Sequence, residues 1–329
     1  MPKIQSRSTK NDPVLMALPL ACSDERAAVE FMEKQRWADQ PACPRCGDMA
    51  VYQMKDSVTG ERQVNYRWRC KGCKQQYTVR TGTVFEDSRI ELRHWCYAFW
   101  RAATSKKGVS ALEIKRQTGL SYKSSLFLLH RIRFAMSGSM PGELSGPIEA
   151  DETYVGGKPR FPLKTKAERE AHFAKKPAVL AILERGGRVR TGVVADVTAK
   201  TLRDAISDNV NPEASTLFTD ELWSYRKVGK EFAGGHHTTK HSAREYARGK
   251  VHSNTVEGFF SIVKRGLNGI YHAVSKEHLH RYLDEFEFRY NHRHMDDGDR
   301  TRAAIQSSEG KRLTYEESKA SEEAYGAEA

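Results

Sequence analysis

The sequence contains no apolar run long enough to cross a lipid bilayer. Its longest early run, residues 14–21, is short and is interrupted by Pro19, whereas a membrane-spanning helix needs about 20 apolar residues. No basic leader with a cleavage site precedes this run, so a secretion signal is not expected. We therefore expect a cytoplasmic protein without membrane contact.

Cysteine is also scarce, with six residues among 329. Four of them stand in two Cys-x-x-Cys pairs, which leaves Cys22 and Cys96 as single cysteines. A small secreted protein held by disulfides shows a dense cysteine framework instead. This pattern therefore excludes that class.

Acidic residues are fewer than basic ones, 42 against 54, which gives a formal charge of +12 and a pI near 9.4. The surplus favours a polyanionic partner such as nucleic acid. A protein with a basic surface and no such partner is the alternative. The length and the 39% hydrophobic content allow two or three domains with at least one sizeable core.

The two cysteine pairs are spaced like the ligands of a structural zinc ion. They are Cys43 with Cys46 and Cys70 with Cys73. Four thiolates at this spacing predict a closed tetrahedral Zn²⁺ site, in which the metal replaces a core that so short a segment cannot build. We expect a zinc ribbon over residues 41–82, after an N-terminal helical segment over residues 1–40. A redox pair is the alternative for either motif alone, and the basic ribbon could contact DNA or act as a spacer or protein-contact module.

A helical region follows over residues 90–137. Residues 110–117 read as one helix, Gly119 permits a turn, and Ser121 can cap a second helix. The pattern predicts a helix-turn-helix, with a plain helical hairpin as the alternative. Its expected DNA contacts are Tyr122, Lys123 and Ser124. On the second helix we expect Leu126, Leu129 and Ile132 to point inward and Lys123, His130, Arg131 and Arg133 to lie at the surface.

Residues 146–295 alternate between strand-like and helical segments. Strands are expected over 147–157, 178–183, 189–194, 215–220 and 236–241, with helices over 199–210 and 251–265. This order predicts an α/β domain. Asp151 on the first strand, Asp220 at the end of the fourth and Glu257 on the last helix would meet at one rim of the sheet. Three carboxylates at one point need a cation to neutralise them, which predicts bound Mg²⁺ or Mn²⁺. Such ions would activate a water or a 3'-hydroxyl for attack on a phosphodiester.

The helix expected at residues 251–265 has two different faces. An apolar stripe comprises Val256, Phe259, Phe260, Val263 and Leu267, while Asn254, Glu257, Ser261 and Lys264 follow one polar edge. A carboxylate able to hold a divalent cation therefore lies two turns from an ammonium able to hold a phosphate. Taken alone, the segment could equally be an ordinary amphipathic helix with solvated charges.

These motifs together resemble bacterial insertion-sequence transposases of the DDE superfamily, in the ISXO-type group that places a zinc ribbon before a ribonuclease H-like domain. The motifs that carry the resemblance are the paired cysteines and residues 149–158, 219–220, 252–261, 264–266, 282–286 and 288–291. The resemblance implies a multidomain α/β protein, with an N-terminal zinc ribbon and helix-turn-helix followed by a ribonuclease H-like mixed-sheet catalytic domain. It also implies an enzyme that binds terminal inverted repeats, hydrolyses a strand and joins the 3'-hydroxyl to target DNA, as a homodimer or higher oligomer on the DNA.

The resemblance also assigns roles to single residues. Asp151, Asp220 and Glu257 would bind magnesium, and Lys264 would contact the DNA end. The group has either Asn or Glu as its third member, and a carboxylate neutralises a cation better than an amide does. We therefore favour Glu257 over Asn254, which would support the site or contact DNA. Further DNA contacts are expected at Lys158, Arg160 and Arg265.

Other polar side chains are alternatives for these roles. Glu149 shares the sheet face of Asp151, Glu152 points the other way and Glu221 adjoins Asp220; surface or supporting roles are expected for all three. A second metal site at His236, His237, His241 and His252 is not favoured, because no carboxylate or cysteine stands at ligand spacing.

The sequence ends in a segment with little apolar pattern. Residues 296–329 are rich in glutamate near their end, and we expect a flexible acidic tail there. Two other functions fit the same motifs: a catalytically silent DNA-binding regulator, and a ribonuclease H-like nuclease that cuts without joining.

Overall fold

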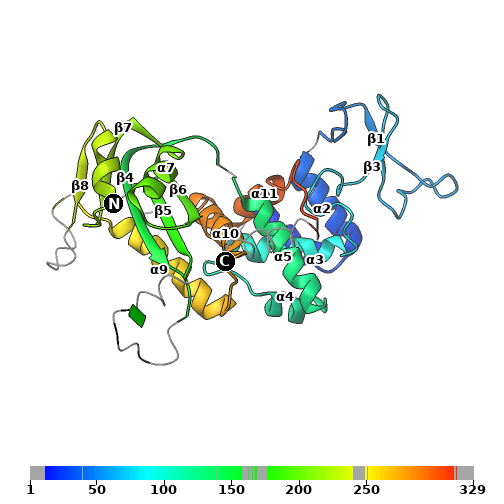
Figure 1. The fold of residues 1–329 in the computed structure, drawn as a ribbon. Helices are drawn as coiled ribbons and strands as arrows, with labels where there is room; N and C mark the ends of the chain where they lie inside the picture. Colours follow the sequence, from blue (N-terminus) through cyan, green and yellow to red (C-terminus); the bar gives the residue numbers. More distant parts are fainter. Residues whose placement is uncertain are drawn as a thin grey trace. The chain divides into compact units, whose positions relative to one another are not determined.

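The structure is a computed structural model that describes residues 12–38, 40–138, 140–157, 162, 165, 167–168, 176–239, 249, 251–314 and 316. The chain forms two compact units. The first combines residues up to 139 with those from 292 onward, and the second comprises residues 140–291. Figure 1 labels most of their helices and strands.

The first unit is mainly helical. Its helices are α1 (Pro13–Ala21), α2 (Glu25–Trp37), α3 (Leu92–Thr104), α4 (Ala111–Thr118), α5 (Tyr122–Met136) and α11 (Asp297–Gln306). The segment before the first cysteine pair thus holds two helices. Asp12 and Asp24 cap them by accepting hydrogen bonds from backbone N–H groups of the first turn. Trp95 and Phe99 of α3 are fully buried in the core of this unit.

The segment after residue 296 does not begin as a flexible tail. Residues 297–306 form α11, which packs against α1, α2 and α3. Its buried positions are Gly298, Thr301, Ala304 and Ile305. Most of these are small or polar, so the sequence shows no clear apolar stripe although the helix is packed. The acidic end of the chain, residues 315 and 317–329, lies outside the described residues.

The zinc ribbon is a small antiparallel sheet attached to α2. Strands β1 (Val51–Gln53), β2 (Trp68–Cys70) and β3 (Gln76–Tyr77) pair in that order. Trp37 at the end of α2 contacts the rings of Trp68 and Tyr77 edge to face. Glu33 accepts a 2.7 Å hydrogen bond from Trp68 Nε1 and pairs with Arg62. The ribbon is therefore held by α2 as well as by its cysteines.

Helices α4 and α5 are joined by a tight turn, as the sequence predicts. Ser110 caps α4, Gly119 ends it in the left-handed region at φ 74°, and Ser121 caps α5. The expectation for the basic residues of α5 is wrong for His130, Arg131 and Arg133, which are buried, and correct for Lys123, which is exposed. Helices α3, α4 and α11 pack around α5, and the Arg131 side chain donates to the carbonyl oxygen of Leu313 at 3.0 Å.

The second unit is built on a mixed five-stranded sheet. Its strands are β4 (Leu144–Tyr154), β5 (Ala178–Glu184), β6 (Val189–Val194), β7 (Val210–Thr219) and β8 (His236–Thr238), in the spatial order β6-β5-β4-β7-β8. Pairing is antiparallel from β6 to β4 and parallel from β4 to β8. Counted within the unit, this order is 3-2-1-4-5, and the domain has the mixed sheet that the sequence predicts.

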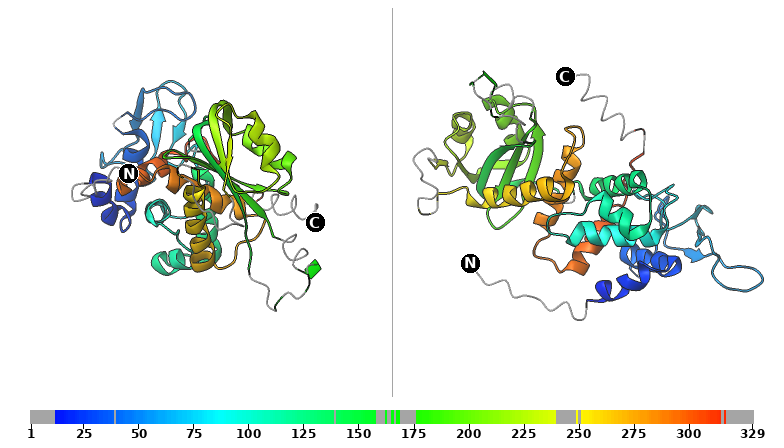
Figure 2. Two further views of the ribbon diagram at one scale, coloured as in Figure 1. Left: turned by 90° about the vertical axis from the view of Figure 1, so that its left-hand side faces the viewer. Right: turned by 90° about the horizontal axis from the view of Figure 1, so that it is seen from below.

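Helices cover both faces of this sheet. They are α7 (Ala199–Ser207), α8 (Tyr225–Val228), the 3-10 turn η2 (Gly229–Glu231), α9 (Asn254–Gly266), the π-helical turn η4 (Leu267–Tyr271) and α10 (Leu279–Asn291). Alternate side chains of the interior strand β5 point to the two faces of the sheet. Val179, Ala181 and Leu183 pack with α9 and α10, whereas Leu180 and Ile182 pack with α7 and α8. Figure 2 shows α9 running along its face of the sheet.

Candidate metal centres and nucleic-acid contacts

The four paired cysteines lie together in the ribbon. All four sulfur atoms are within 4.8 Å of one another, with Cys43 and Cys73 at 3.7 Å and Cys46 and Cys70 at 3.6 Å. A tetrahedral zinc ion with about 2.3 Å bonds to sulfur requires sulfur separations of about 3.8 Å. In the absence of a metal, a hydrogen bond from a backbone N–H lowers the pKa of Cys46 to about 7, whereas burial raises the pKa of Cys70 to about 12, so the fit to zinc rests on the sulfur positions. The set therefore fits a structural zinc site.

Asp151, Asp220 and Glu257 come from three different elements of the second unit. Asp151 lies on the central strand β4, Asp220 directly follows β7, and Glu257 lies in the first turn of α9. Ile148 and Ala150 of β4 belong to the cluster beneath α7. Strand alternation therefore places Asp151 on the face covered by α9, the helix that carries Glu257.

The three carboxylates are close enough for their charges to interact. Burial raises the pKa of Asp151 to about 7, and the charges of Glu152, Asp220 and Glu257 add to the effect. Their ligand atoms are less tightly gathered than those of the cysteines. Among the described residues, the cysteines are the only group of three or more possible metal ligands whose atoms all lie within 4.8 Å.

Glu152 and Tyr225 form a polar contact on the opposite face of β4. The Tyr225 hydroxyl donates a 2.6 Å hydrogen bond to Glu152 Oε2, and Tyr225 is fully buried. Burial raises the pKa of Glu152, while this hydrogen bond acts in the opposite direction. Tyr225 was not identified from the sequence, because nothing near it in the chain indicates a carboxylate partner.

The polar edge predicted from the sequence lies along α9. Asn254, Lys264 and Arg265 are exposed and Glu257 is partly buried. The Ser253 hydroxyl donates to Glu257 Oε1 at 3.1 Å and makes no cap bond to the helix backbone. Ser253 is a supporting residue that sequence reasoning missed, since a serine before a helix usually indicates an N-cap.

Glu149 is fully buried, so a surface role is excluded for it. Its carboxylate accepts hydrogen bonds from Arg185 Nε at 2.6 Å and from the backbone N–H groups of Thr255 and Val256 at 2.9 and 3.0 Å. Arg185 also donates to the carbonyl oxygen of His252 at 2.6 Å. These contacts connect β4 to the beginning of α9. Sequence reasoning did not single out Arg185.

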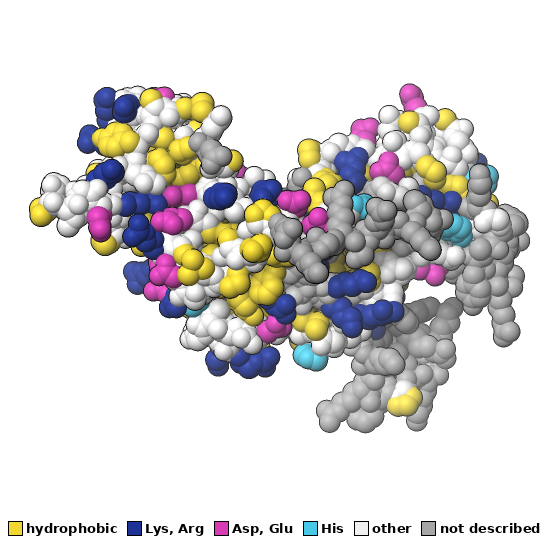
Figure 3. Space-filling view, turned by 180° about the vertical axis from the view of Figure 1, so that it is seen from behind, with side chains coloured by type: hydrophobic (Ala, Val, Ile, Leu, Met, Phe, Trp, Pro, Cys, Tyr) yellow, Lys and Arg dark blue, Asp and Glu magenta, His cyan; other side chains and the backbone are white. Residues whose placement is uncertain are grey.

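The remaining expected DNA contacts are only partly described. Tyr122 and Lys123 are exposed in the first turn of α5 and Ser124 is partly exposed. Lys158, Arg160 and His241 lie outside the described residues. On the face shown in Figure 3, Lys and Arg side chains stand in several separate groups with acidic side chains nearby. On this face, the distribution of basic side chains therefore does not mark a path for DNA.

Three of the four histidines considered for a second metal site are described, and each of them contacts a protein side chain. His236 Nε2 and the Thr219 hydroxyl are 2.9 Å apart, the His237 ring stacks on Phe218 at 5.3 Å, and His252 Nδ1 lies 3.3 Å from Glu149. Burial lowers the pKa of His236, which favours its neutral form. These rings belong to the packing around β7, β8 and the start of α9.

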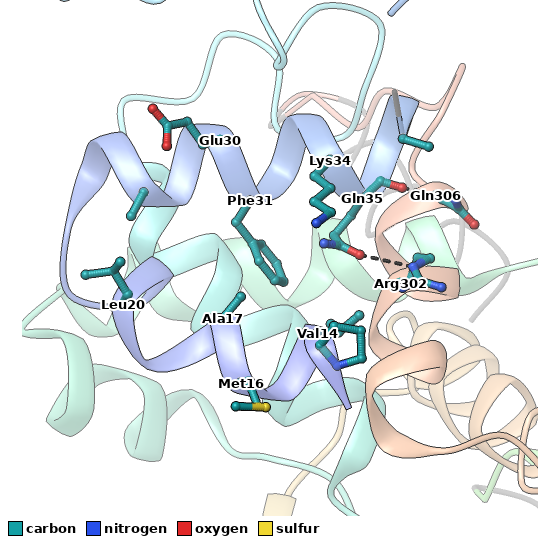
Figure 4. A pocket seen from close by; sticks show the side chains of 13 residues that line it. Val14, Met16, Ala17, Leu20, Glu30, Phe31, Lys34, Gln35, Arg302 and Gln306 are labelled. Atoms are coloured by element: carbon teal, nitrogen blue, oxygen red, sulfur yellow. Dashed lines mark hydrogen bonds between the residues drawn. The ribbon is translucent and has the colours of Figure 1, made fainter. Parts of the chain in front are cut away.

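A cavity of about 730 Å³ belongs to the first unit, between α1, α2 and α11. Figure 4 shows the apolar side chains of Val14, Leu20 and Phe31 around it, and the hydrogen bond between Arg302 and Gln35 at its edge. No metal-binding cluster lines it among the described residues.

None of the helices in the described part of the chain has the length and apolar character needed to span a bilayer.

Comparison with known proteins follows the same division of the chain. Residues 143–291 match the ISXO2-like transposase domain, and residues 23–76 match the transposase zinc-ribbon domain. A protein in the transposable element ISH50 of Halobacterium salinarum is 30% identical over 278 residues, which cover 80% of this chain and 90% of that protein. A transposase-like protein of Haemophilus influenzae is 33% identical over 105 residues, 32% of this chain and 81% of that protein. The chain therefore belongs to the ISXO2-like transposases of insertion sequences, with their zinc ribbon at its N-terminal end.

Proposed function

We propose that this transposase binds the terminal inverted repeats of an insertion sequence, cleaves a strand by metal-dependent hydrolysis and joins the free 3'-hydroxyl to target DNA by transesterification. The observation that carries the proposal is electrostatic: the charges of Asp220 and Glu257 act on Asp151, although the three residues come from the end of β7, from α9 and from β4. Their mutual repulsion contributes to the raised pKa of Asp151. Such a cluster of acidic charge suits divalent cations.

In this proposal Asp151, Asp220 and Glu257 hold Mg²⁺ or Mn²⁺. Bound ions of this kind lower the pKa of an attacking water or hydroxyl and stabilise the leaving oxygen. The hydrogen bond from the Ser253 hydroxyl to Glu257 Oε1, at 3.1 Å, would help to orient the Glu257 carboxylate. Asn254 stays a candidate for the third ligand, because it begins the same helix and is exposed.

The exposed residues near this cluster are proposed to hold the DNA. Lys264 lies two turns beyond Glu257 on α9 and Arg265 follows it, so both can contact phosphates. In the first unit, Tyr122, Lys123 and Ser124 would contact DNA from the start of α5. Because an insertion sequence has two ends that must be joined to the same target, we propose a homodimer or larger homo-oligomer on DNA in the bacterial cytoplasm.

The test is incubation of the zinc-loaded protein with labelled terminal-repeat DNA and Mg²⁺ or Mn²⁺. Asp151→Ala, Asp220→Ala and Glu257→Ala should each abolish nicking while leaving end binding intact. Glu213→Ala is the matched control, because Glu213 is an exposed carboxylate near the start of β7. It should cleave like the wild-type protein.

A second substrate with pre-cleaved ends separates cleavage from joining. Joined products support a transposase, and nicking without joining supports a nuclease. DNA binding without either product supports a silent regulator. Normal nicking by all three alanine variants would contradict the assignment of the metal centre. Loss of nicking in Asn254→Ala, with normal nicking in Glu257→Ala, would make Asn254 the third ligand.

A further inference from the structure

Glu149 is an unusual carboxylate because it lies in the middle of a central strand and is fully buried. A buried charge is strongly destabilising unless hydrogen bonds and opposite charges compensate it. Glu149 has both kinds of partner. Arg185 Nε donates to Oε1, and two backbone N–H groups of α9 donate to Oε2.

These contacts replace the usual cap of α9. The first N–H groups of a helix need acceptors from outside the helix, which the residue before it normally supplies. Here Glu149 accepts from the N–H groups of Thr255 and Val256, and from the Thr255 hydroxyl at 3.0 Å. Ser253 occupies the cap position but donates its hydroxyl to Glu257 instead. The capping carboxylate therefore comes from β4, 106 residues away.

Arg185 extends the contact to a third element. Its guanidinium lies over the ring of Phe218 on β7 at 4.0 Å. It also donates to the backbone of His252 just before α9. The Glu149 clamp, defined as Glu149, Arg185, Phe218 and Thr255, thus touches β4, β7 and α9 at once.

One clamp residue on each element is followed at the same offset by a proposed metal ligand, and in the case of β7 this ligand, Asp220, lies just after the end of the strand. Asp151 follows Glu149 by two residues, Asp220 follows Phe218 by two, and Glu257 follows Thr255 by two. Side chains two apart on a strand share a face. Two residues of a helix span only about 3 Å of rigid backbone. Fixing the clamp residues relative to one another therefore fixes the backbones that carry the three carboxylates.

We propose that Glu149 is a positioning residue of the metal centre, which sets the placement of α9 against β4 and β7 and does not bind the metal itself. The predicted effect on the affinity for divalent cations rests on the proposed function, whereas the clamp itself does not. The Glu149 carboxylate is already engaged on both oxygens by α9 and Arg185, which leaves Asp151, Asp220 and Glu257 to face the ion.

Glu287 provides a matched control in the same unit. It lies on α10 and accepts from the backbone N–H of Thr191 at 2.8 Å, from the Thr191 hydroxyl at 3.0 Å and from Arg190 at 3.0 Å. Glu287→Gln therefore removes the same kind of charged contact as Glu149→Gln. Its partners are on β6 and not on the elements that carry the proposed ligands.

The first measurement needs no activity. Amide hydrogen exchange of Thr255 and Val256 in the protein without added divalent cations should become at least about tenfold faster in Glu149→Gln and stay unchanged in Glu287→Gln. Thr255→Val, a milder change that removes only the hydroxyl contact, should shift the exchange of Val256 in the same direction by less. Unchanged exchange at both amides in Glu149→Gln would refute the clamp.

The second measurement is a Mn²⁺ titration of the zinc-loaded protein, followed by the electron paramagnetic resonance signal of the free ion. Glu149→Gln should weaken Mn²⁺ binding about tenfold, with nicking restored at higher Mn²⁺, and Glu287→Gln should bind Mn²⁺ normally. Equal affinities in Glu149→Gln and Glu287→Gln would overturn the inference. So would total loss of binding in Glu149→Gln with normal binding in Glu257→Gln, because Glu149 would then be a ligand. If the wild-type protein binds no Mn²⁺ while the exchange result holds, the proposed function fails and the clamp stands.

Discussion

Asp151→Asn should stabilise the second unit at neutral pH when no divalent cation is added, although it should abolish cleavage. Burial and the neighbouring carboxylates raise the pKa of Asp151 from 3.8 to about 7. A carboxyl with a raised pKa binds its proton more tightly in the folded than in the unfolded chain, so its contribution to the free energy of unfolding falls as the pH rises from about 4 to about 7.

The size of this effect follows from the same pKa difference. At about 1.4 kcal/mol per pKa unit the full difference is about 4 kcal/mol, and solvent screening of a partly exposed group lowers the expected gain to about 2 kcal/mol. Asparagine is uncharged at both pH values, whereas Asp151 must bury a negative charge at high pH. The gain in unfolding free energy from Asp151→Asn should therefore be largest at pH 8 and less than half as large at pH 5.

The assay is native-state hydrogen exchange of the buried β5 amides, which reports the unfolding free energy of this unit. Asp204→Asn, an exposed change on α7, is the control and should stay within about 0.5 kcal/mol of the wild-type protein at both pH values. Added Mg²⁺ should stabilise the wild-type protein more than Asp151→Asn. A loss of stability at pH 8, or an equal gain at both pH values, would refute the reasoning.

Three further changes test other parts of the molecule. Cys70→Ser should release zinc and unfold the ribbon, as measured by metal content and by exchange of the ribbon amides; full zinc occupancy would contradict the site. Tyr225→Phe removes the donor to Glu152 and should lower the free energy of unfolding by about 1–3 kcal/mol in a urea titration, and an unchanged transition would show that this hydrogen bond contributes nothing. Lys264→Ala should weaken binding of all DNA sequences alike and reduce the slope of binding against salt by about 1; an unchanged slope would exclude a phosphate contact.

The sequence predicts those parts of the fold that have a local signal. Residues 189–194 are a short apolar-rich strand after two glycines, and β6 has those bounds. The apolar stripe of α9 likewise matches its buried residues, Val256, Phe259, Phe260 and Val263. The paired cysteines are informative for the same reason, since two Cys-x-x-Cys motifs at this spacing predict one zinc site, and the structure brings the four sulfur atoms together.

The parts that could not be predicted depend on partners far away in the chain. Glu149 looks like a surface acid until Arg185 and the first turn of α9 are placed around it. Arg131 looks like a surface cation until Leu313 supplies an acceptor. Helix α11 is packed through small and polar residues, so hydrophobic periodicity does not reveal it. Long-range pairing decides each of these cases.

The most direct test of the metal centre is the anomalous X-ray scattering of Mn²⁺ in crystals of the protein with terminal-repeat DNA. We predict Mn²⁺ within about 2.2 Å of carboxylate oxygens of Asp151, Asp220 and Glu257, with Glu149 still hydrogen-bonded to the start of α9. Mn²⁺ held elsewhere in crystals that cleave the DNA, with these three carboxylates unoccupied, would contradict it.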